Sequence, residues 1–152
     1  MTPAELAYSE AVRAISGQAG TIDTMRSNTS TLLGASAVAT AFLGAEGVGT
    51  EGLNGWGLVA TVCFAIVGLL SVVILFPIKQ WRFGLDPKAV MAMYHEQPPA
   101  SDEELFEDAA HSLHQYRLHN ASRIEMLAWS FRAASVFLVL GVMAWILELA
   151  TR

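Results

Sequence analysis

The stretch GWGLVATVCFAIVGLLSVVILFP, residues 55–77, decides the fold of this chain. It lies within 27 consecutive residues, between Glu51 and Lys79, that carry no formal charge. A helix needs about 20 predominantly apolar residues to cross the hydrocarbon core of a bilayer. The stretch therefore predicts a transmembrane helix over residues 56–77, which ends where Pro77 removes a backbone donor.

Two further uncharged stretches flank this one. There are 19 such residues between Arg26 and Glu46, and 15 between Arg132 and Glu148. They predict spans over residues 29–46 and 129–149, with residues 47–55 as a short loop after the first span. Only 15% of the chain is charged, compared with about 25% in an average soluble domain. The sequence therefore predicts an all-α integral membrane protein with three transmembrane helices.

The basic residues predict how these spans are oriented. Residues 1–28 carry Arg13 and Arg26, and residues 78–128 carry five of the nine Lys and Arg residues. The loop 47–55 carries none. Because cytoplasmic loops of membrane proteins are enriched in Lys and Arg, we expect a multi-pass protein of the cell inner (plasma) membrane. Its N-terminus and residues 78–128 would be cytoplasmic, and its C-terminus would lie outside.

The four tryptophans agree with this arrangement. Trp56 and Trp145 fall at the outer ends of the predicted spans, and Trp81 and Trp129 fall at the inner ends. Tryptophan prefers the headgroup level because its ring is apolar and its N–H needs a polar partner. We therefore expect these side chains to mark the two membrane surfaces.

Capping signals predict helices on the cytoplasmic side. Residues 2–5 read Thr-Pro-Ala-Glu, a start signal for a helix over 2–26, but Gly17 and Gly20 favour a break before the membrane. Asp86-Pro87 predicts a short helix over 87–96. Residues 101–104 read Ser-Asp-Glu-Glu, and no Pro or Gly follows until Gly141. This predicts a long amphipathic helix from about 102 to 149, continuous from cytosol into membrane.

An apolar stripe along the long helix predicts self-association. Its members recur at intervals of three and four residues: Phe106, Ala109, Leu113, Tyr116, Asn120, Ile124, Leu127 and Phe131. A polar residue such as Asn120 at a helical seam often fixes register and oligomer number. The alternative is that Asn120 is a capped or water-bonded residue at the membrane boundary.

Small residues on the first span give a second candidate interface. Ser36, Thr40 and Gly44 lie four residues apart, so they share one helical face on which another backbone can approach closely. The close approach could serve packing inside one protomer or packing between protomers, and the sequence leaves both open.

Several kinds of chemistry are excluded or weakly supported. A net charge of −5 argues against nucleic-acid binding, and no nucleotide-binding, metalloprotease or hydrolase motif occurs. We therefore assign no catalytic residue, metal ligand or cofactor. His111, His114 and His119 are interpreted as part of a solvated helix face. Arg117 and Arg123 are candidates for binding a small anionic ligand.

The order of elements resembles a known family. The features are Asp23 before a Gly- and Ala-rich span, the VVILFP ending of the second span at 72–77, and a cytosolic helix that runs through NASRIEML at 120–127 into a last span. In this order the chain resembles small transmembrane effectors of bacterial anti-phage defence, above all the Pycsar type and, more loosely, the SLATT type. The resemblance implies membrane disruption or depolarisation triggered by a nucleotide signal.

Two hypotheses of function follow. In the first, the chain is a non-enzymatic membrane effector that forms a homo-oligomer and permeabilises the bilayer when a cytosolic signal arrives. In the second, it is a constitutive scaffold or accessory subunit that recruits a soluble protein through its cytosolic helices. The expected partners are the membrane, further copies of the chain, and either a small nucleotide or a cytosolic protein. A transporter is disfavoured because no charged residue lies deep within a predicted span, and an enzyme because no catalytic motif occurs.

Overall fold

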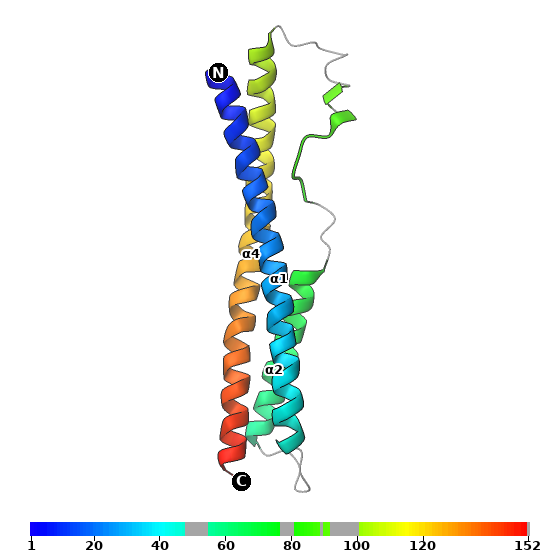
Figure 1. The fold of residues 1–152 in the computed structure, drawn as a ribbon, viewed down its shortest axis with the longest axis vertical. Helices are drawn as coiled ribbons and strands as arrows, with labels where there is room; N and C mark the ends of the chain where they lie inside the picture. The colour runs from blue at the N-terminus through cyan, green and yellow to red at the C-terminus, as the bar shows by residue number, and fades with distance from the viewer. Residues whose placement is uncertain (48–54, 77–80, 89, 92–100, 152) are drawn as a thin grey trace. The chain divides into compact units, whose positions relative to one another are not determined.

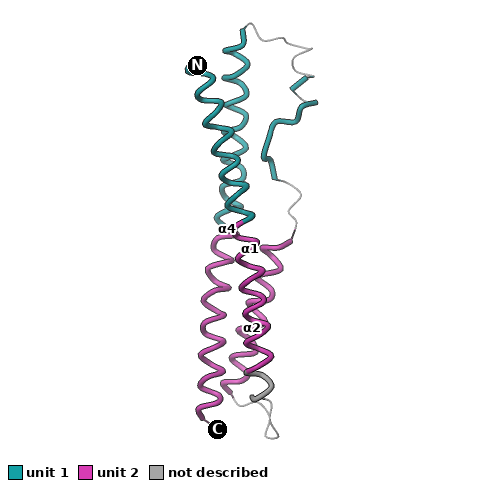
Figure 2. The backbone as a smooth tube through the Cα atoms, in the orientation of Figure 1, with its two compact units in different colours: residues 1–23, 78–125 teal, residues 24–77, 126–152 magenta. Residues whose placement is uncertain are grey.

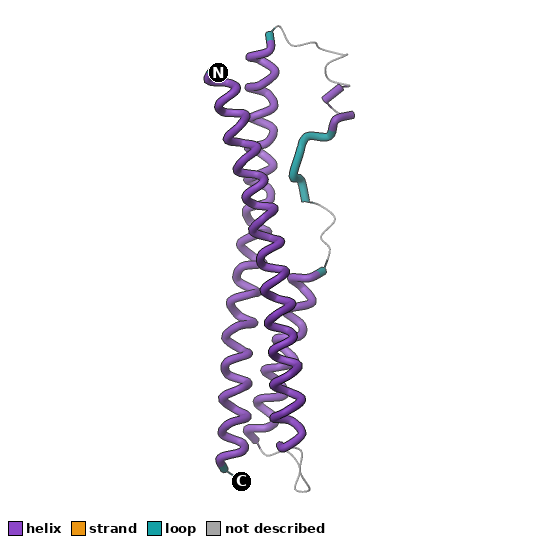
Figure 3. The backbone as a smooth tube through the Cα atoms, in the orientation of Figure 1, coloured by secondary structure: helices purple, strands orange, loops and turns teal. Residues whose placement is uncertain are grey.

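The chain folds into long helices. The computed structural model describes residues 1–47, 55–76, 81–88, 90–91 and 101–151. Its main elements are α1 (Pro3–Gly47), α2 (Gly55–Leu75) and α4 (Asp102–Ala150) (Figure 1). Over these residues all regular secondary structure is helical and there is no strand (Figure 3). The expectation of an all-α chain is confirmed, and so is that of one continuous helix from about 102 to 149.

The helices are divided between two compact units (Figure 2). Unit 1 comprises residues 1–23 and 78–125, and unit 2 comprises residues 24–77 and 126–152. The first part of α1 and the first part of α4 therefore belong to unit 1. Their remaining parts, together with α2, belong to unit 2.

The predicted starts of the two long helices, α1 and α4, have the expected caps. The Thr2 backbone N–H donates to Glu5 Oε2 at 2.8 Å, and the Glu5 N–H donates to Thr2 Oγ1 at 3.2 Å. At the start of α4, the Glu104 N–H donates to Ser101 Oγ at 3.2 Å. These bonds satisfy amides that have no partner within the helix itself.

The expected break near Gly17 and Gly20 is wrong, because α1 is one helix of 45 residues. The physical reason is that α1 buries one face at regular intervals. Ile15, Ile22, Thr29 and Ser36 are all buried and lie seven residues apart. The helix-breaking tendency of a glycine, about 1 kcal/mol, is outweighed by packing along this face.

Buried residues on α4 recur at the same interval of seven residues, so α1 and α4 have buried faces with matching spacing. The buried positions Leu113, Asn120, Leu127, Ala134, Gly141 and Glu148 are each separated by seven residues. A seven-residue repeat is typical of helices that pack in the manner of a coiled coil. In unit 1 the helices run parallel, since Tyr8 contacts Phe106 and Gln18 bonds to Arg117. The predicted short helix 87–96 is described only in part, and residues 92–100 lie outside the described residues.

In unit 2, α2 runs antiparallel to α4. The Gly57 N–H at the start of α2 bonds to Glu148 near the end of α4, and Gly141 lies against Cys63 and Phe64. The core cluster is Ala60, Phe64, Ala144 and Trp145, with Ala39 of α1 packed against it. Trp145 is only 2% exposed. Its ring fills the space that the small side chains Ala60 and Ala144 leave between helices.

Two of the described helices, α2 and α4, are long and apolar enough to cross a membrane. Neither is a buried core helix, because only 33% of the apolar stretch in α2 and 28% of that in α4 is buried. A membrane association is therefore supported, whereas the span expected over residues 29–46 of α1 does not reach the same apolar character.

Candidate functional site

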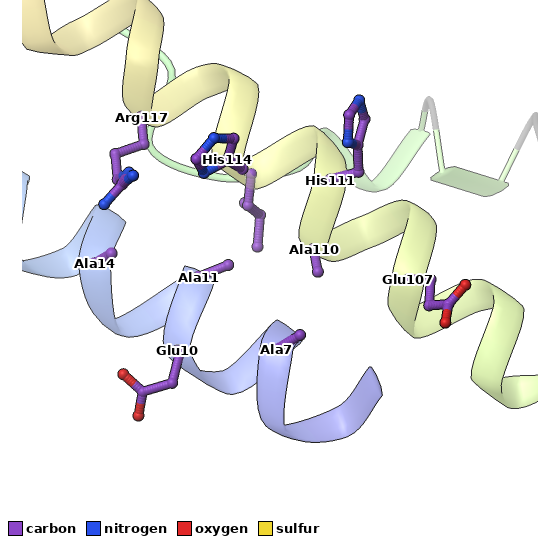
Figure 4. A pocket seen from close by; sticks show the side chains of 10 residues that line it. Ala7, Glu10, Ala11, Ala14, Glu107, Ala110, His111, His114 and Arg117 are labelled. Atoms are coloured by element: carbon purple, nitrogen blue, oxygen red, sulfur yellow. The ribbon is translucent and has the colours of Figure 1, made fainter. Parts of the chain in front are cut away.

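A groove runs between α1 and α4 in unit 1 (Figure 4). Its volume is about 540 Å³. The groove exists because both helices present small side chains where they meet, so their backbones are not covered. The α1 side is formed by Ala7, Glu10, Ala11 and Ala14, and the α4 side by Glu107, Ala110, His111, Leu113, His114 and Arg117.

The ends of the groove carry opposite charges. Glu107 lies at the end nearest Ala7, and Arg117 lies at the end nearest Ala14 (Figure 4). Between them the floor is made of alanine methyl groups and Leu113. Within the part of the chain that is described, no cluster of His, Cys, Asp and Glu could hold a metal ion. The groove is therefore suited to an elongated partner with a small apolar face and charges at both ends.

The structure separates the two arginines that the sequence grouped as ligand candidates. Arg117 lines the groove, and its backbone carbonyl accepts a hydrogen bond from Gln18 Nε2 at 3.0 Å. Arg123 is partly buried and is not among the residues that line the groove. Only Arg117 is therefore placed to bind a partner in this groove.

Asn120 is fully buried in unit 1, and its amide binds backbone. Asn120 Nδ2 donates to the Arg82 carbonyl at 2.9 Å, and the Arg82 N–H donates to Asn120 Oδ1 at 3.5 Å. The Arg82 guanidinium also lies over the Tyr116 ring, 5.4 Å from its centroid. These contacts fasten residues 81–86, which we call the strap, onto α4.

The rest of the predicted stripe is covered to different degrees. Leu113 and Leu127 are buried, while Phe106, Tyr116 and Ile124 are partly buried. The Phe106 ring packs against Tyr8 of α1, with 5.6 Å between the ring centroids. Residues 106–120 thus pack within the protomer, which leaves the exposed side chains as candidates for contacts between copies.

Of the small residues predicted to form a second interface on α1, one is buried. Ser36 is buried in unit 2, and Thr40 Oγ1 donates to the Ser36 carbonyl at 2.8 Å. Gly44 lies in α1, but its burial falls outside the described residues. Ser36 therefore packs within the protomer, which is one of the two alternatives that its spacing allowed.

Glu148 is a residue that the sequence reasoning missed. It is 0% exposed, and its Oε2 accepts a hydrogen bond from the Gly57 N–H at 2.9 Å. The positive N-terminal end of α2 favours a carboxylate at this place. The signal was present in the sequence, because an acid in the last turn of a helix opposes that helix's own dipole and needs a partner elsewhere.

Other proteins do not add to this description. Comparison with protein-family models, with curated proteins and with solved structures finds no match to the chain.

Proposed function

We propose that the chain is a non-enzymatic effector of the bacterial inner membrane. In this proposal it spans the bilayer three times, self-associates, and permeabilises the membrane when a cytosolic signal reaches unit 1. A cyclic nucleotide is the signal that the family resemblance suggests.

The observation that carries the membrane part of the proposal is the apolar exterior of unit 2, together with polar side chains among its buried residues. Thr29, Ser36, Ser71 and Glu148 are buried, whereas the large apolar side chains Phe42, Leu69 and Val139 are 74%, 69% and 62% exposed. In water, so many exposed large apolar side chains would cost hydrophobic free energy. In lipid the same surface is favourable, because the bilayer core is itself apolar.

This distribution also supports α1 as the third span. Thr29 and Ser36 of α1 lie on its buried face, and Ala39 packs against the core of unit 2. The Thr29 hydroxyl donates to the Met25 carbonyl at 2.7 Å, so its polarity is satisfied within the helix. A helix of this composition can lie in a bilayer when two more apolar helices accompany it.

The continuity of α1 and α4 supports signal transmission. Each is an unbroken helix with one part in unit 1 and one part in unit 2. A rigid helix that has two arrangements can carry a change from one place to another. Ligand binding in unit 1 would then shift the population of an open membrane state.

The proposal is tested with the full chain in vesicles of phosphatidylethanolamine and phosphatidylglycerol that contain a fluorescent dye. We expect cyclic nucleotides from a panel of mono- and dinucleotides to accelerate dye release, and overproduction to be toxic to cells. An absence of both release and toxicity would contradict the effector function.

A second candidate function is a constitutive scaffold that recruits a cytosolic protein. The groove on unit 1 favours it, because an alanine-lined surface with charged ends fits a helix of a soluble partner. A scaffold predicts stable co-purification of one soluble protein and normal growth on overproduction.

A further inference from the structure

Two exposed helix faces in unit 1 have matching spacing. The groove presents Glu107, Ala110, His114 and Arg117 of α4, separated by three, four and three residues. On α1, Arg13, Ser16, Gly20 and Asp23 are all exposed and have the same separations. Residues spaced in this way lie along one side of a helix.

The charges at the ends of these faces are opposite in order. Along α4 the acid Glu107 precedes the base Arg117 by ten residues, whereas along α1 the base Arg13 precedes the acid Asp23 by ten. At 1.5 Å per residue, each pair spans about 15 Å. Parallel alignment of the two faces brings opposite charges together at both ends. Antiparallel alignment brings like charges together at both ends, which is unfavourable.

We propose that the α1 face of one copy docks in the groove of a second copy, with Arg13 against Glu107 and Asp23 against Arg117. The inference rests on the self-association in the proposed function and names the surface responsible. Copies inserted in one membrane with the same topology are parallel, which is the alignment that the charges require.

The middle of each face allows the helices to approach closely. Ser16 and Gly20 have small side chains, and a Cβ placed on Gly20 would meet nothing within 4 Å. In copies at the same height, Ser16 would lie near Ala14 and His114, at the Arg117 end of the groove. Close approach of backbones over small residues gains dispersion contacts that bulky side chains would prevent.

The positions of Arg13 and Glu107 along the helix axes of unit 1 are compatible with this pairing. Because Tyr8 lies level with Phe106, Arg13 lies about four residues beyond Glu107, which is about 6 Å. Arginine and glutamate side chains can span this offset. Arg13 also lies 3.8 Å from Glu10 of its own helix, with both side chains largely exposed. Glu10 borders the same groove, so Arg13 of the second copy would meet two acids there.

Such an interface is heterologous, because each copy contributes one face and receives the other. It produces a ring if the rotation between copies closes, and an open array if it does not. Exposed ion pairs contribute little affinity individually. Their role here is to select orientation and register, while the apolar floor and the confinement of the copies in a bilayer favour association.

Charge exchange tests the pairing in the full chain, by sedimentation in a mild detergent. The double variants Arg13→Glu/Asp23→Arg and Glu107→Arg/Arg117→Glu should each weaken association about tenfold. The quadruple variant should restore it, because both ends are again opposite in charge. Loss of association in all three variants, or in none of them, would overturn the proposal.

Cross-linking tests the geometry independently of affinity. Ser16→Cys in one tagged chain and His114→Cys in another should form a disulfide between chains when the two are mixed in vesicles, because Ser16 is level with His114 when the copies lie at the same height. The matched control is Ser16→Cys with Gln115→Cys, since Gln115 is exposed but does not line the groove. Equal cross-linking in both mixtures would contradict the proposed face.

The two proposals fail in distinguishable ways. If the charge exchange restores association but no vesicle releases dye, the interface stands and the effector function is wrong. If dye is released while neither double variant changes sedimentation, the effector function stands and the copies meet elsewhere. Capture of a different protein by the groove, with no cross-link between copies, would support the scaffold function and overturn the interface.

Discussion

At the scale of single residues, Glu148 shows how a buried carboxylate can be tolerated in an apolar unit. It lies at the C-terminal end of α4, where that helix's dipole disfavours a negative charge, but also at the N-terminal end of α2, where the dipole favours it. The antiparallel packing of α2 and α4 therefore converts an unfavourable position into a favourable one. The bond to Gly57 ties the ends of the two helices together.

We expect Glu148→Ala to destabilise unit 2 by about 2 kcal/mol, since a hydrogen bond is lost from a buried site. Glu148→Gln should cost less, because its amide oxygen can still accept from Gly57. Thermal unfolding in detergent, followed by tryptophan fluorescence, measures both. The control is Glu125→Ala, at an exposed position, which should be within about 0.5 kcal/mol of the parent. Equal stability of the Glu148→Ala variant and this control would contradict the assigned role.

Gly141 gives a second prediction about a single residue. A Cβ at this position would lie 3.2 Å from the Cys63 Cβ and 3.3 Å from the Phe64 ring. Gly141→Ala should therefore destabilise unit 2 by about 1–3 kcal/mol through overpacking. Gly68→Ala is the matched control, because the added methyl meets nothing within 4 Å. It should be neutral, or stabilising by up to about 1 kcal/mol through helix propensity.

At the scale of elements, the strap depends on Asn120. Asn120→Ala removes two hydrogen bonds to the Arg82 backbone, each worth about 1 kcal/mol. The strap should open more often, and trypsin should cleave after Arg82 about tenfold faster in the folded protein. The exposed neighbour His119 provides the control variant, His119→Ala, which should leave the cleavage rate unchanged. An unchanged rate in Asn120→Ala would mean that other contacts hold the strap.

The two long helices were not equally predictable. The bounds of α4 followed closely from its Ser-Asp-Glu-Glu cap and the lack of Pro and Gly up to Gly141. The continuity of α1 does not follow from its sequence, because Gly17 and Gly20 locally favour a break and the opposing packing arises only in the folded protein. Likewise, a polar residue on the stripe of α4 indicated that Asn120 needs a partner. The sequence could not name that partner, since Arg82 is 38 residues away and lies in no regular helix.

The predicted break in α1 affects which substitutions test self-association. With a broken α1, the stripe around Leu113 would be partly uncovered, and Leu113→Asp would act on contacts between copies. In the structure Leu113 is buried and lines the floor between α1 and α4. A charge there would disrupt unit 1 itself, so the exposed charges Arg13, Asp23, Glu107 and Arg117 are better probes of association.

At the scale of the whole molecule, composition and charge blocks predicted the helical class and the membrane character. They could not show that polar side chains such as Ser71 and Thr29 are buried while valines and leucines are exposed. That distribution depends on which face each helix turns inward. It is therefore a property of packing, which the hydropathy of a single stretch does not show.

Topology is the prediction that tests the proposed three spans together. An enzyme that is active only outside the cytoplasm should work when fused after Arg152 or inserted between residues 47 and 55. It should be inactive when inserted at residue 99, because the basic region 78–128 is expected to stay in the cytoplasm. A cytoplasm-specific reporter at the same three places should give the opposite pattern. If α1 did not cross the membrane, residues 1–28 and the 47–55 loop would lie on the same side. A reporter fused before Met1 would then match one inserted at 47–55, instead of giving the opposite signal that three spans require.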